Sequence, residues 1–433
     1  MKNESVALTP PMGWNSWDVY GASVTEDEVR RNAEYMAEHL KKFGWEYIVV
    51  DIQWYEPGAN SCEYRPFTEL EMDEYSRLIP AVNRFPSAAN GMGFKSLADY
   101  IHELGLKFGI HLMRGIPRQA VHKNTKILGT DIKAREIAST DSICRWNTDM
   151  YGVNPEKDGA MQYYDSLIEL YASWGVDYIK VDDTSCAEIG DIPYFAGEIE
   201  LIRNAIDKCG RNIILSLSPG PTSLEFAEHV KSNSNMWRIT GDYWDRWEDL
   251  YKEFDVCNKW SNHSGPGHWP DADMLPIGYL GIRTNPNELG IGRVTNFTRE
   301  EQVTMMTLWC MFRSPLMLGC ELTRIDDWTL NLITNKDVLR ILNDSKNGHQ
   351  VYRKNDEIIW IAQDNDDESI YVALFNIKGE ESTLFISLNK LGIKYNSNIR
   401  DLWSHKEIGN FNYDEILKFK INSHGCRLFK IYK

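Results

Sequence analysis

One unit recurs along the first half of the chain: an amphipathic helix ends near a glycine, and an apolar strand follows within one or two residues. Helices that alternate with nearly continuous apolar strands predict a parallel sheet covered by helices. The predicted helices, each with its strand, occupy residues 25–42 and 45–51, 94–104 and 106–113, 161–174 and 176–182, and 197–209 and 211–218.

Polar residues gather at the carboxyl ends of the predicted strands. A doubly wound open sheet would satisfy the same alternation of helices and strands, but no G-x-G-x-x-G follows the first strand. A site assembled from many strand ends favours a (β/α)8 barrel, which a helix at 299–311 and a strand at 314–319 would complete. The polar residues at the strand ends are Asp51, His111, Asp182, Ser218 and Arg238.

The pattern changes near residue 345, where short alternating strands without helical periodicity begin. Strands are predicted at 358–363, 369–377, 382–388 and 426–433, separated by polar turns. We therefore predict a catalytic barrel over residues 1–343 and an antiparallel β-sandwich domain over residues 344–433. The segment 114–155 is too long for a plain connection and is predicted to form a lid or a wall of the site.

Charge and composition exclude several classes of partner. The net charge is −16 and the basic residues are scattered, which argues against nucleic acid. No apolar run is long enough for a membrane span, and the eight cysteines show no metal-ligand spacing. We expect no cofactor and no metal, because His268, Asp271 and Asp273 are better explained as braces of a loop. Taken as complete, the chain is expected to be a cytoplasmic protein, or a secreted one if a leader was removed; its oligomeric state is open.

Two carboxylates stand where chemistry is expected. Lys180 and Asp182 share one face of a strand, and charges at the end of an apolar strand are costly unless they are used. The cation keeps Asp182 ionised, as a nucleophile must be, although a buried structural ion pair is the alternative. Asp242 follows the break at Gly241, which suits a general acid. A pair of carboxylates flanking a glycosidic bond is the requirement for glycoside hydrolysis.

These residues belong to a set of ordered motifs. The set begins with Thr-Pro-Pro-Met-Gly-Trp-Asn-Ser-Trp at 9–17 and continues with the strand that ends at Asp51 and with Lys-Val-Asp at 180–182. It ends with Trp-Arg at 237–238 and Gly-His-Trp-Pro-Asp-Ala-Asp-Met-Leu at 267–275. Over residues 9–340 the chain resembles glycoside hydrolase family 27, the family of α-galactosidases and α-N-acetylgalactosaminidases.

The resemblance implies roles for individual residues. It implies that Asp182 is the nucleophile and that Asp242 is the acid/base of a retaining exo-glycosidase. It also implies a sugar pocket in which cationic side chains donate to ring hydroxyls, a carboxylate accepts from them and a tryptophan stacks on the apolar sugar face. The matching pocket positions are Trp17, Asp51, Lys180, Arg238 and Met274.

The chain departs from the family pattern where specificity is decided. Family α-galactosidases usually have Asp and Cys after the Asp51 position, where this chain has Ile52 and Gln53. Thr184 replaces the cysteine that usually follows the nucleophile, so the pocket disulfide of the family is not expected. Ser218 stands at the position of a glutamate that contacts the 2-hydroxyl, and His111 replaces a common tyrosine. A strand histidine is also a frequent structural group.

Several substrates are compatible with these departures. The resemblance favours terminal α-D-galactosides, hydrolysed by double displacement through a glycosyl-Asp182 intermediate. Ser218 motivates α-N-acetylgalactosaminidase activity, and Ile52 motivates β-L-arabinopyranosidase activity, because arabinopyranose is galactose without its hydroxymethyl group. Ile52 also leaves cleavage of α-glucosides open. A catalytically inactive carbohydrate-binding barrel is the alternative from a different class.

Overall fold

Eight parallel strands form the central sheet of the protein. The computed structural model describes residues 6–61, 63–185, 194–218, 220–284 and 292–433. The strands lie in the order β10, β9, β8, β7, β3, β2, β1, β13, and each pairs in parallel with its neighbour. Their bounds are β1 (Met12–Asn15), β2 (Tyr47–Val50), β3 (Lys107–Met113), β7 (Tyr178–Asp182), β8 (Ile214–Ser218), β9 (Met236–Arg238), β10 (Trp269–Asp271) and β13 (Leu316–Leu318).

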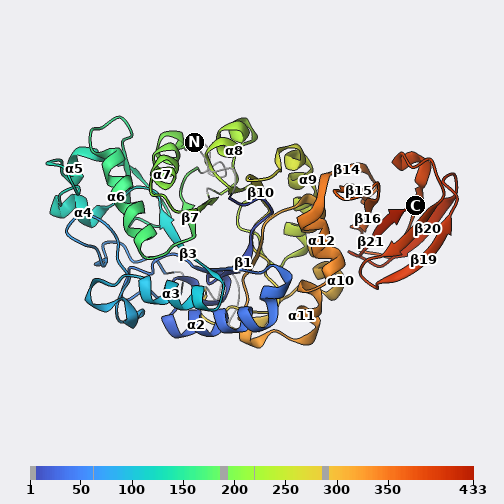
Figure 1. Cartoon of the computed structure of the whole chain (residues 1–433), viewed down its shortest axis with the longest axis horizontal. Coiled ribbons are helices and arrows are strands. Elements are labelled where there is room, and N and C mark those ends of the chain that lie inside the picture. Colours follow the sequence, from blue (N-terminus) through green and yellow to red (C-terminus); the bar gives the residue numbers. More distant parts are fainter. Residues whose placement is uncertain (1–5, 62, 186–193, 219, 285–291) are drawn as a thin grey trace.

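The sheet curls until its two edges meet. A parallel bridge joins Leu318 of β13 to Leu275, which follows β10, and the Leu275 N–H donates to the carbonyl of Met317 at 2.8 Å. Figure 1 shows the strands at the centre and the helices around them. The predicted (β/α)8 barrel is therefore confirmed, as are the four predicted strands after the recurring glycines, to within about three residues at each end.

Helices surround the barrel. Thr25 and Glu28 form a capping box at the start of the helix predicted from residue 25, in which the Thr25 N–H donates to Glu28 Oε2 at 2.9 Å. The helix predicted over 25–42 is broken into α2 (Glu26–Tyr35), a π-helical turn (Met36–Leu40) and a 3₁₀ turn (Lys41–Phe43). The other helices of the barrel are α1 (Trp17–Tyr20), α3 (Lys95–Glu103), α6 (Ala160–Ser173), α7 (Ala196–Lys208), α8 (Ala227–Asn233), α9 (Trp247–Trp260), α10 (Arg299–Phe312), α11 (Asp327–Ile333) and α12 (Lys336–Asp344).

The interior of the barrel is a packed core with a polar end. Side chains alternate across a strand, so residues two apart point the same way. The inner cluster contains Val49, Tyr178 and Met236, each of which lies two residues before a polar residue at the carboxyl end of its strand. This apolar floor leaves the polar side chains together at one end of the barrel. The complete inner cluster is Tyr47, Val49, Tyr178, Ile214, Met236, Trp269, Met274 and Met317.

The long segment after β3 folds into a small subdomain of its own. It contains β4 (Ile116–Pro117), α4 (Arg118–Lys123), α5 (Ala134–Ile137), β5 (Ala138–Ile143) and β6 (Met150–Val153), and its strands pair in the order β4, β6, β5. Arg118 donates its backbone N–H to the Asp149 carbonyl at 2.9 Å, which ties α4 to the start of β6. The segment is thus ordered structure next to the strand ends of β3 and β7.

An antiparallel β domain follows the barrel at one end of the long axis (Figure 1). Two sheets pack around a second apolar cluster that includes Leu374, Leu384 and Phe429. A C-terminal antiparallel β domain is therefore confirmed, whereas its division from the barrel at residue 343/344 stays a prediction. One sheet contains β14 (Ser345–Lys354), β15 (Glu357–Asp364), β16 (Ile370–Asn376), β21 (Cys426–Tyr432), β18 (Ser397–Asp401) and β19 (Lys406–Phe411), and the other β17 (Ser382–Ser387) and β20 (Ile416–Ile421).

The state of the cysteines and the apolar character of the helices can be described for most of the chain. The described cysteines are free thiols: Cys144, Cys209, Cys257, Cys310, Cys320 and Cys426. Cys62 and Cys186 lie outside the described residues. Within the described ranges, no helix has the length and apolar character that crossing a bilayer requires.

Candidate active site

The carboxyl ends of the barrel strands bring the predicted site residues together. β7 lies between β3 and β8, so His111 pairs in register with Lys180, and Asp182 pairs with Ser218. Asp51 follows β2, and Arg238 is the last residue of β9. Because all these strands run in the same direction, their polar ends face one end of the barrel.

Asp51 and Lys180 form a buried ion pair. Lys180 Nζ donates to Asp51 Oδ2 at 2.9 Å, and their side chains are 14% and 2% exposed. Asn15 Nδ2 donates to the same oxygen at 2.7 Å, and the Ile52 N–H donates to Oδ1 at 2.8 Å. Burial alone would raise the pKa of Asp51, but the charge of Lys180 and these hydrogen bonds hold it below its usual range. Asp51 is therefore a fixed anion that accepts hydrogen bonds.

Lys180 faces two carboxylates. Burial disfavours its ammonium form, yet the charges of Asp51 and Asp182 raise the pKa of Lys180 above its ordinary value. It remains a cation through the neutral range and presents N–H donors at the floor of the site. A sugar hydroxyl placed between Lys180 and Asp51 would find both a donor and an acceptor.

The carboxylate of Asp182 is held at both oxygens. The Asp183 N–H donates to Oδ1 at 3.1 Å, and Nε2 of His111 lies 3.2 Å from Oδ2. The Asp182 side chain is 20% exposed, whereas His111 is fully buried. In this structure the His111 Nδ1 has no hydrogen-bond partner. A carboxylate that is fixed in place and still open to solvent is suited to attack on a substrate.

Asp242 stands opposite a buried cation. Arg238 Nη2 donates to Asp242 Oδ1 at 3.0 Å and lies 3.2 Å from Asp273 Oδ2. Arg238 Nη1 donates to Ser218 Oγ at 3.4 Å. The Asp242 side chain is 77% exposed, so it lies at the open side of the site. Desolvation is the largest effect and would raise the pKa of Asp242, but the charge and hydrogen bond of Arg238, together with the charge of Lys180, lower it below its usual range.

The loop after β10 is braced by carboxylates, as predicted. Asp273 accepts from the Tyr243 N–H at 2.9 Å and from the Met274 N–H at 2.8 Å, and Asp271 accepts from the Asp273 N–H at 2.9 Å. Burial and the charge of Asp273 raise the pKa of Asp271 to about 7. Among the described residues, no group of three or more His, Cys, Asp or Glu side chains is placed to hold a metal ion.

The remaining predicted residues lie around these charges. The backbone N–H of Trp17 donates to Asn15 Oδ1 at 2.8 Å. The Trp17 ring lies parallel to that of Tyr64, with centroids 6.2 Å apart. Met274 is 9% exposed and belongs to the inner cluster against which Trp17 packs. Ile52 is 2% exposed and directly follows Asp51. Gln53, next in the chain, turns away and donates to Asp149 Oδ2 at 2.9 Å.

Residues that the sequence did not single out support this geometry. Arg114, just past the end of β3, donates to Asp183 and to Glu198 of α7. Asn15 holds both Asp51 and Trp17. A buried arginine directly after a strand was a signal available in the sequence, but its partners are too distant in the chain to be identified from spacing alone.

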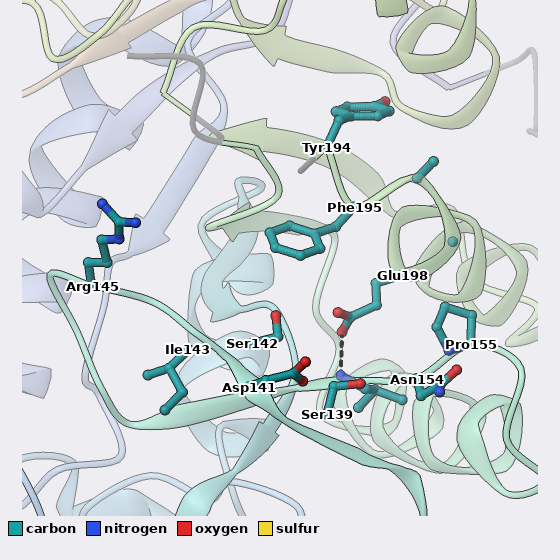
Figure 2. Close-up of a pocket in the computed structure, with 13 residues that line it drawn as sticks. Ser139, Asp141, Ser142, Ile143, Arg145, Asn154, Pro155, Tyr194, Phe195 and Glu198 are labelled. Atoms are coloured by element: carbon teal, nitrogen blue, oxygen red, sulfur yellow. Dashed lines mark hydrogen bonds between the residues drawn. The ribbon is translucent and has the colours of Figure 1, made fainter. Parts of the chain in front are cut away.

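A cavity of about 600 Å³ lies beside this support. Its walls come from β5, from the residues after β6 and from the start of α7 (Figure 2). Glu198 and Phe195 line it, and the Phe195 ring packs 3.5 Å from the guanidinium carbon of Arg114. The cavity therefore adjoins the residues that support the strand end bearing Asp182.

Comparisons with known proteins place this geometry in context. The model of the family described as alpha galactosidase A matches residues 9–154 and 154–344, and that of the alpha galactosidase C-terminal beta sandwich domain matches residues 354–431. The α-galactosidase of Cyamopsis tetragonoloba is 28% identical over 434 residues, which cover 99% of this chain and 87% of that protein.

Two solved structures are more similar in sequence. A family 27 β-L-arabinopyranosidase from Geobacillus stearothermophilus is 59% identical with a TM-score of 0.96, over 99% of this chain and 97% of that chain. A Bacillus halodurans C-125 protein assigned by name to the α-N-acetylgalactosaminidases is 51% identical with a TM-score of 0.89, over 100% and 99% of the two chains.

Proposed function

The chain belongs to glycoside hydrolase family 27, and on that premise we propose that it releases terminal β-L-arabinopyranose from glycosides with retention of anomeric configuration. Asp182 is the nucleophile and Asp242 the general acid/base. The proposal replaces the α-D-galactoside that the family resemblance favoured, because the galactoside reading gives no role to a buried isoleucine beside Asp51.

Ile52 is the observation that carries this choice. Its side chain is 2% exposed and directly follows Asp51, which with Lys180 forms the polar floor of the site. β-L-Arabinopyranose has the ring configuration of α-D-galactose but no hydroxymethyl group. An apolar side chain at this position offers no partner to a sixth hydroxyl, and a buried hydroxyl without a partner is costly. The 59% identical β-L-arabinopyranosidase supports the same substrate.

In the first step, the Asp182 carboxylate attacks the anomeric carbon while Asp242 transfers its proton to the departing glycosidic oxygen. The C–O bond to the leaving group breaks, and a glycosyl ester of Asp182 forms. In the free protein Arg238 holds Asp242 as a carboxylate. The acid step therefore requires Asp242 to take up a proton as substrate enters and weakens this ion pair, which its 77% exposure allows.

In the second step, water replaces the leaving group. Asp242 removes a proton from the water, the resulting oxygen attacks the anomeric carbon, and Asp182 departs as a carboxylate. The Asp183 N–H and the cation of Lys180 stabilise the negative charge that returns to Asp182. Two inversions at one carbon give net retention.

A comparison of four p-nitrophenyl glycosides tests the substrate. We expect kcat/KM to be highest for β-L-arabinopyranoside, above α-D-galactoside, α-N-acetylgalactosaminide and α-D-glucoside. A higher value for the galactoside would contradict the role given to Ile52. Binding of these sugars without any turnover would instead support an inactive carbohydrate-binding barrel.

One observation favours a second substrate. Ser218 is a small residue, 3% exposed, whose Oγ lies 3.4 Å from Arg238 Nη1. A small side chain near the 2-position leaves room for an acetamido group, and the 51% identical relative carries that assignment. Highest kcat/KM on the α-N-acetylgalactosaminide would select this function.

A further inference from the structure

We propose that Arg114 is a positioning residue: it locks Asp183 in a left-handed backbone conformation, so that the Asp183 N–H is aimed at the nucleophilic carboxylate. The inference rests on the proposed role of Asp182. It assigns a function to a buried ion-pair network of Arg114, Asp183 and Glu198 that the reaction steps above do not require.

Arg114 holds the end of β7 through its backbone and its side chain. Its N–H donates to the Asp182 carbonyl at 3.1 Å. Its Nε donates to the Asp183 carbonyl at 2.7 Å, and its Nη2 donates to Asp183 Oδ2 at 2.7 Å. The guanidinium thus fixes both the backbone and the side chain of Asp183.

Asp183 adopts a backbone conformation that is costly for residues other than glycine, although aspartate and asparagine adopt it more often than the rest. Its φ is 61°, in the left-handed region where the Cβ of an L-residue is crowded by its own backbone. Such a conformation persists only where the surroundings over-determine it. The two hydrogen bonds from Arg114 to Asp183 supply that constraint.

The consequence falls on Asp182. The N–H of Asp183 belongs to the peptide plane between Asp182 and Asp183, and a flip of that plane changes ψ of Asp182 and φ of Asp183 together. In the orientation that accompanies the left-handed φ, this N–H lies 3.1 Å from Asp182 Oδ1. The other oxygen, Oδ2, faces His111 at 3.2 Å. A hydrogen bond that is already aimed at Oδ1 fixes the direction of the carboxylate and stabilises its charge when the glycosyl ester breaks down.

The clamp is anchored away from the reacting atoms. Arg114 Nη1 donates to Glu198 Oε1 at 2.6 Å, and Arg114 and Glu198 are 2% and 4% exposed. Glu198 Oε2 accepts from Tyr164 OH at 2.8 Å and from the Val153 N–H at 3.0 Å, and the latter bond is the dashed line in Figure 2. Helices α6 and α7 and strand β6 therefore hold Arg114 in place.

A rescue experiment tests this lock. Arg114→Met and Arg114→Lys are expected to lower kcat about 10- to 100-fold, the loss typical of a displaced reacting group, with KM changed less than about threefold. Glycine adopts a left-handed conformation without the clamp. Asp183→Gly added to Arg114→Met should therefore recover kcat about tenfold relative to Arg114→Met alone.

The matched control is Asp183→Ala in the same Arg114→Met background. Like Asp183→Gly, this substitution removes the carboxylate that would be left buried without the Arg114 guanidinium. Unlike glycine, alanine still has an energetic cost in the left-handed backbone conformation. Recovery with glycine and not with alanine supports the lock. Equal recovery with both, or no loss of kcat in Arg114→Met, overturns it.

Folding and function are checked separately. Thermal unfolding identifies any variant that fails to fold. If Arg114→Met fails to fold, the Asp183→Gly and Asp183→Ala substitutions are made in Arg114→Lys instead, and the same results support or overturn the proposal. Arg313→Lys changes another buried arginine, which donates to the carbonyls of Leu342 and Asn343 in helix α12, and should lower Tm without changing kcat. If the unsubstituted chain turns over none of the four glycosides, the proposed function is contradicted. If it is active but glycine does not rescue Arg114→Met, only the positioning role of Arg114 is contradicted.

Discussion

Asp242 and Arg238 form an ion pair at the open side of the site, and in the proposed reaction this pair controls proton transfer. The guanidinium lowers the pKa of Asp242, which favours the carboxylate that must deprotonate water in the second step. In the proposed reaction, both steps therefore depend on how substrate changes the distance between this carboxyl and Arg238. The exposure of Asp242 leaves it free to move, whereas Arg238 is buried and fixed by Asp273 and Ser218.

Asp242→Ala should separate leaving groups by their need for a proton. We expect hydrolysis of an alkyl glycoside to fall about 10²- to 10⁴-fold, as is usual when general acid catalysis is lost. Cleavage of a 2,4-dinitrophenyl glycoside should fall much less in its first step, because that leaving group departs without a proton. Steady-state and burst kinetics measure the two. Equal losses on both substrates would contradict the acid role of Asp242.

Ile52→Asp tests the proposal that Ile52 selects the sugar. A buried polar side chain beside Asp51 would give a galactose hydroxymethyl group a hydrogen-bond partner. The ratio of kcat/KM for α-D-galactoside to that for β-L-arabinopyranoside should therefore rise by about tenfold or more. Ile52→Val, which changes only volume, serves as the control and should leave the ratio nearly unchanged. A ratio that does not move in Ile52→Asp argues that this position does not select the sugar.

Single residues were predictable where strand alternation applies. Lys180 and Asp182 share a face of β7, and the contact of Asp182 with His111 follows from the neighbouring parallel strands β7 and β3, whereas Lys180 reaches Asp51 at the end of β2 across β3. The left-handed φ of Asp183 was not predictable, because an aspartate carries no signal for it comparable to that of glycine. The roles of predicted site residues as sugar contacts stay proposals.

At the scale of elements, helix α9 lies behind the loop that carries Asp242. Its Glu253 is 1% exposed, with one oxygen, Oε2, that has no hydrogen-bond partner in this structure. Burial raises the pKa of Glu253 to about 8, although a hydrogen bond with Thr240 acts in the opposite direction. The folded protein therefore keeps this proton at pH values where the unfolded chain, with a glutamate pKa of about 4.3, has lost it.

This difference makes stability depend on pH with a definite sign. Between about pH 4.3 and pH 8 the folded state binds one more proton at Glu253 than the unfolded state does. The contribution of Glu253 to the free energy of unfolding therefore falls by at most about 1.4 kcal/mol for each unit rise in pH. We expect Tm of the unsubstituted chain to fall more between pH 5 and pH 8.5 than Tm of Glu253→Gln. Glu248→Gln, an exposed site on the same helix, is the control. Parallel declines in all three would show that Glu253 is not held neutral by burial.

Elements were predicted well where local signals agree. Capping boxes at Thr25 and Thr298 identified the starts of α2 and α10, and the glycines after helices identified the strands that follow. In the β domain, the predicted strands match β15, β16, β17 and β21, whereas β14, β18, β19 and β20 were missed. The residues of β14 are mostly polar, and its pairing with β15 is visible only in three dimensions. The break of the 25–42 helix into π and 3₁₀ turns likewise has no cue in apolar spacing.

At the scale of the whole molecule, the β domain is joined to the barrel by specific contacts. The His424 ring lies parallel to that of Trp247 with centroids 3.6 Å apart, and its Nδ1 lies 2.7 Å from Glu301 Oε1. Trp403 Nε1 donates to Thr307 Oγ1 of α10 at 2.9 Å. None of these pairs is close in sequence, so the junction was beyond reach of spacing and periodicity.

His424→Ala tests whether this junction contributes to stability alone. Loss of the ring contact and the hydrogen bond with Glu301 should destabilise the protein by about 1–3 kcal/mol, because a buried partner is left unsatisfied. We expect a lower midpoint in urea unfolding and an unchanged kcat. A large fall in kcat in the folded variant would mean that the β domain supports the site directly.

The proposed retaining reaction depends most on Asp182 as its nucleophile. Asp182→Gly should hydrolyse an activated glycoside at a very low rate, and added azide should restore turnover by entering the space of the missing carboxylate. The predicted product, identified by NMR, is a glycosyl azide whose anomeric configuration is opposite to that of the substrate. Near-normal hydrolysis by Asp182→Gly in the absence of azide would contradict the role of Asp182 as the nucleophile.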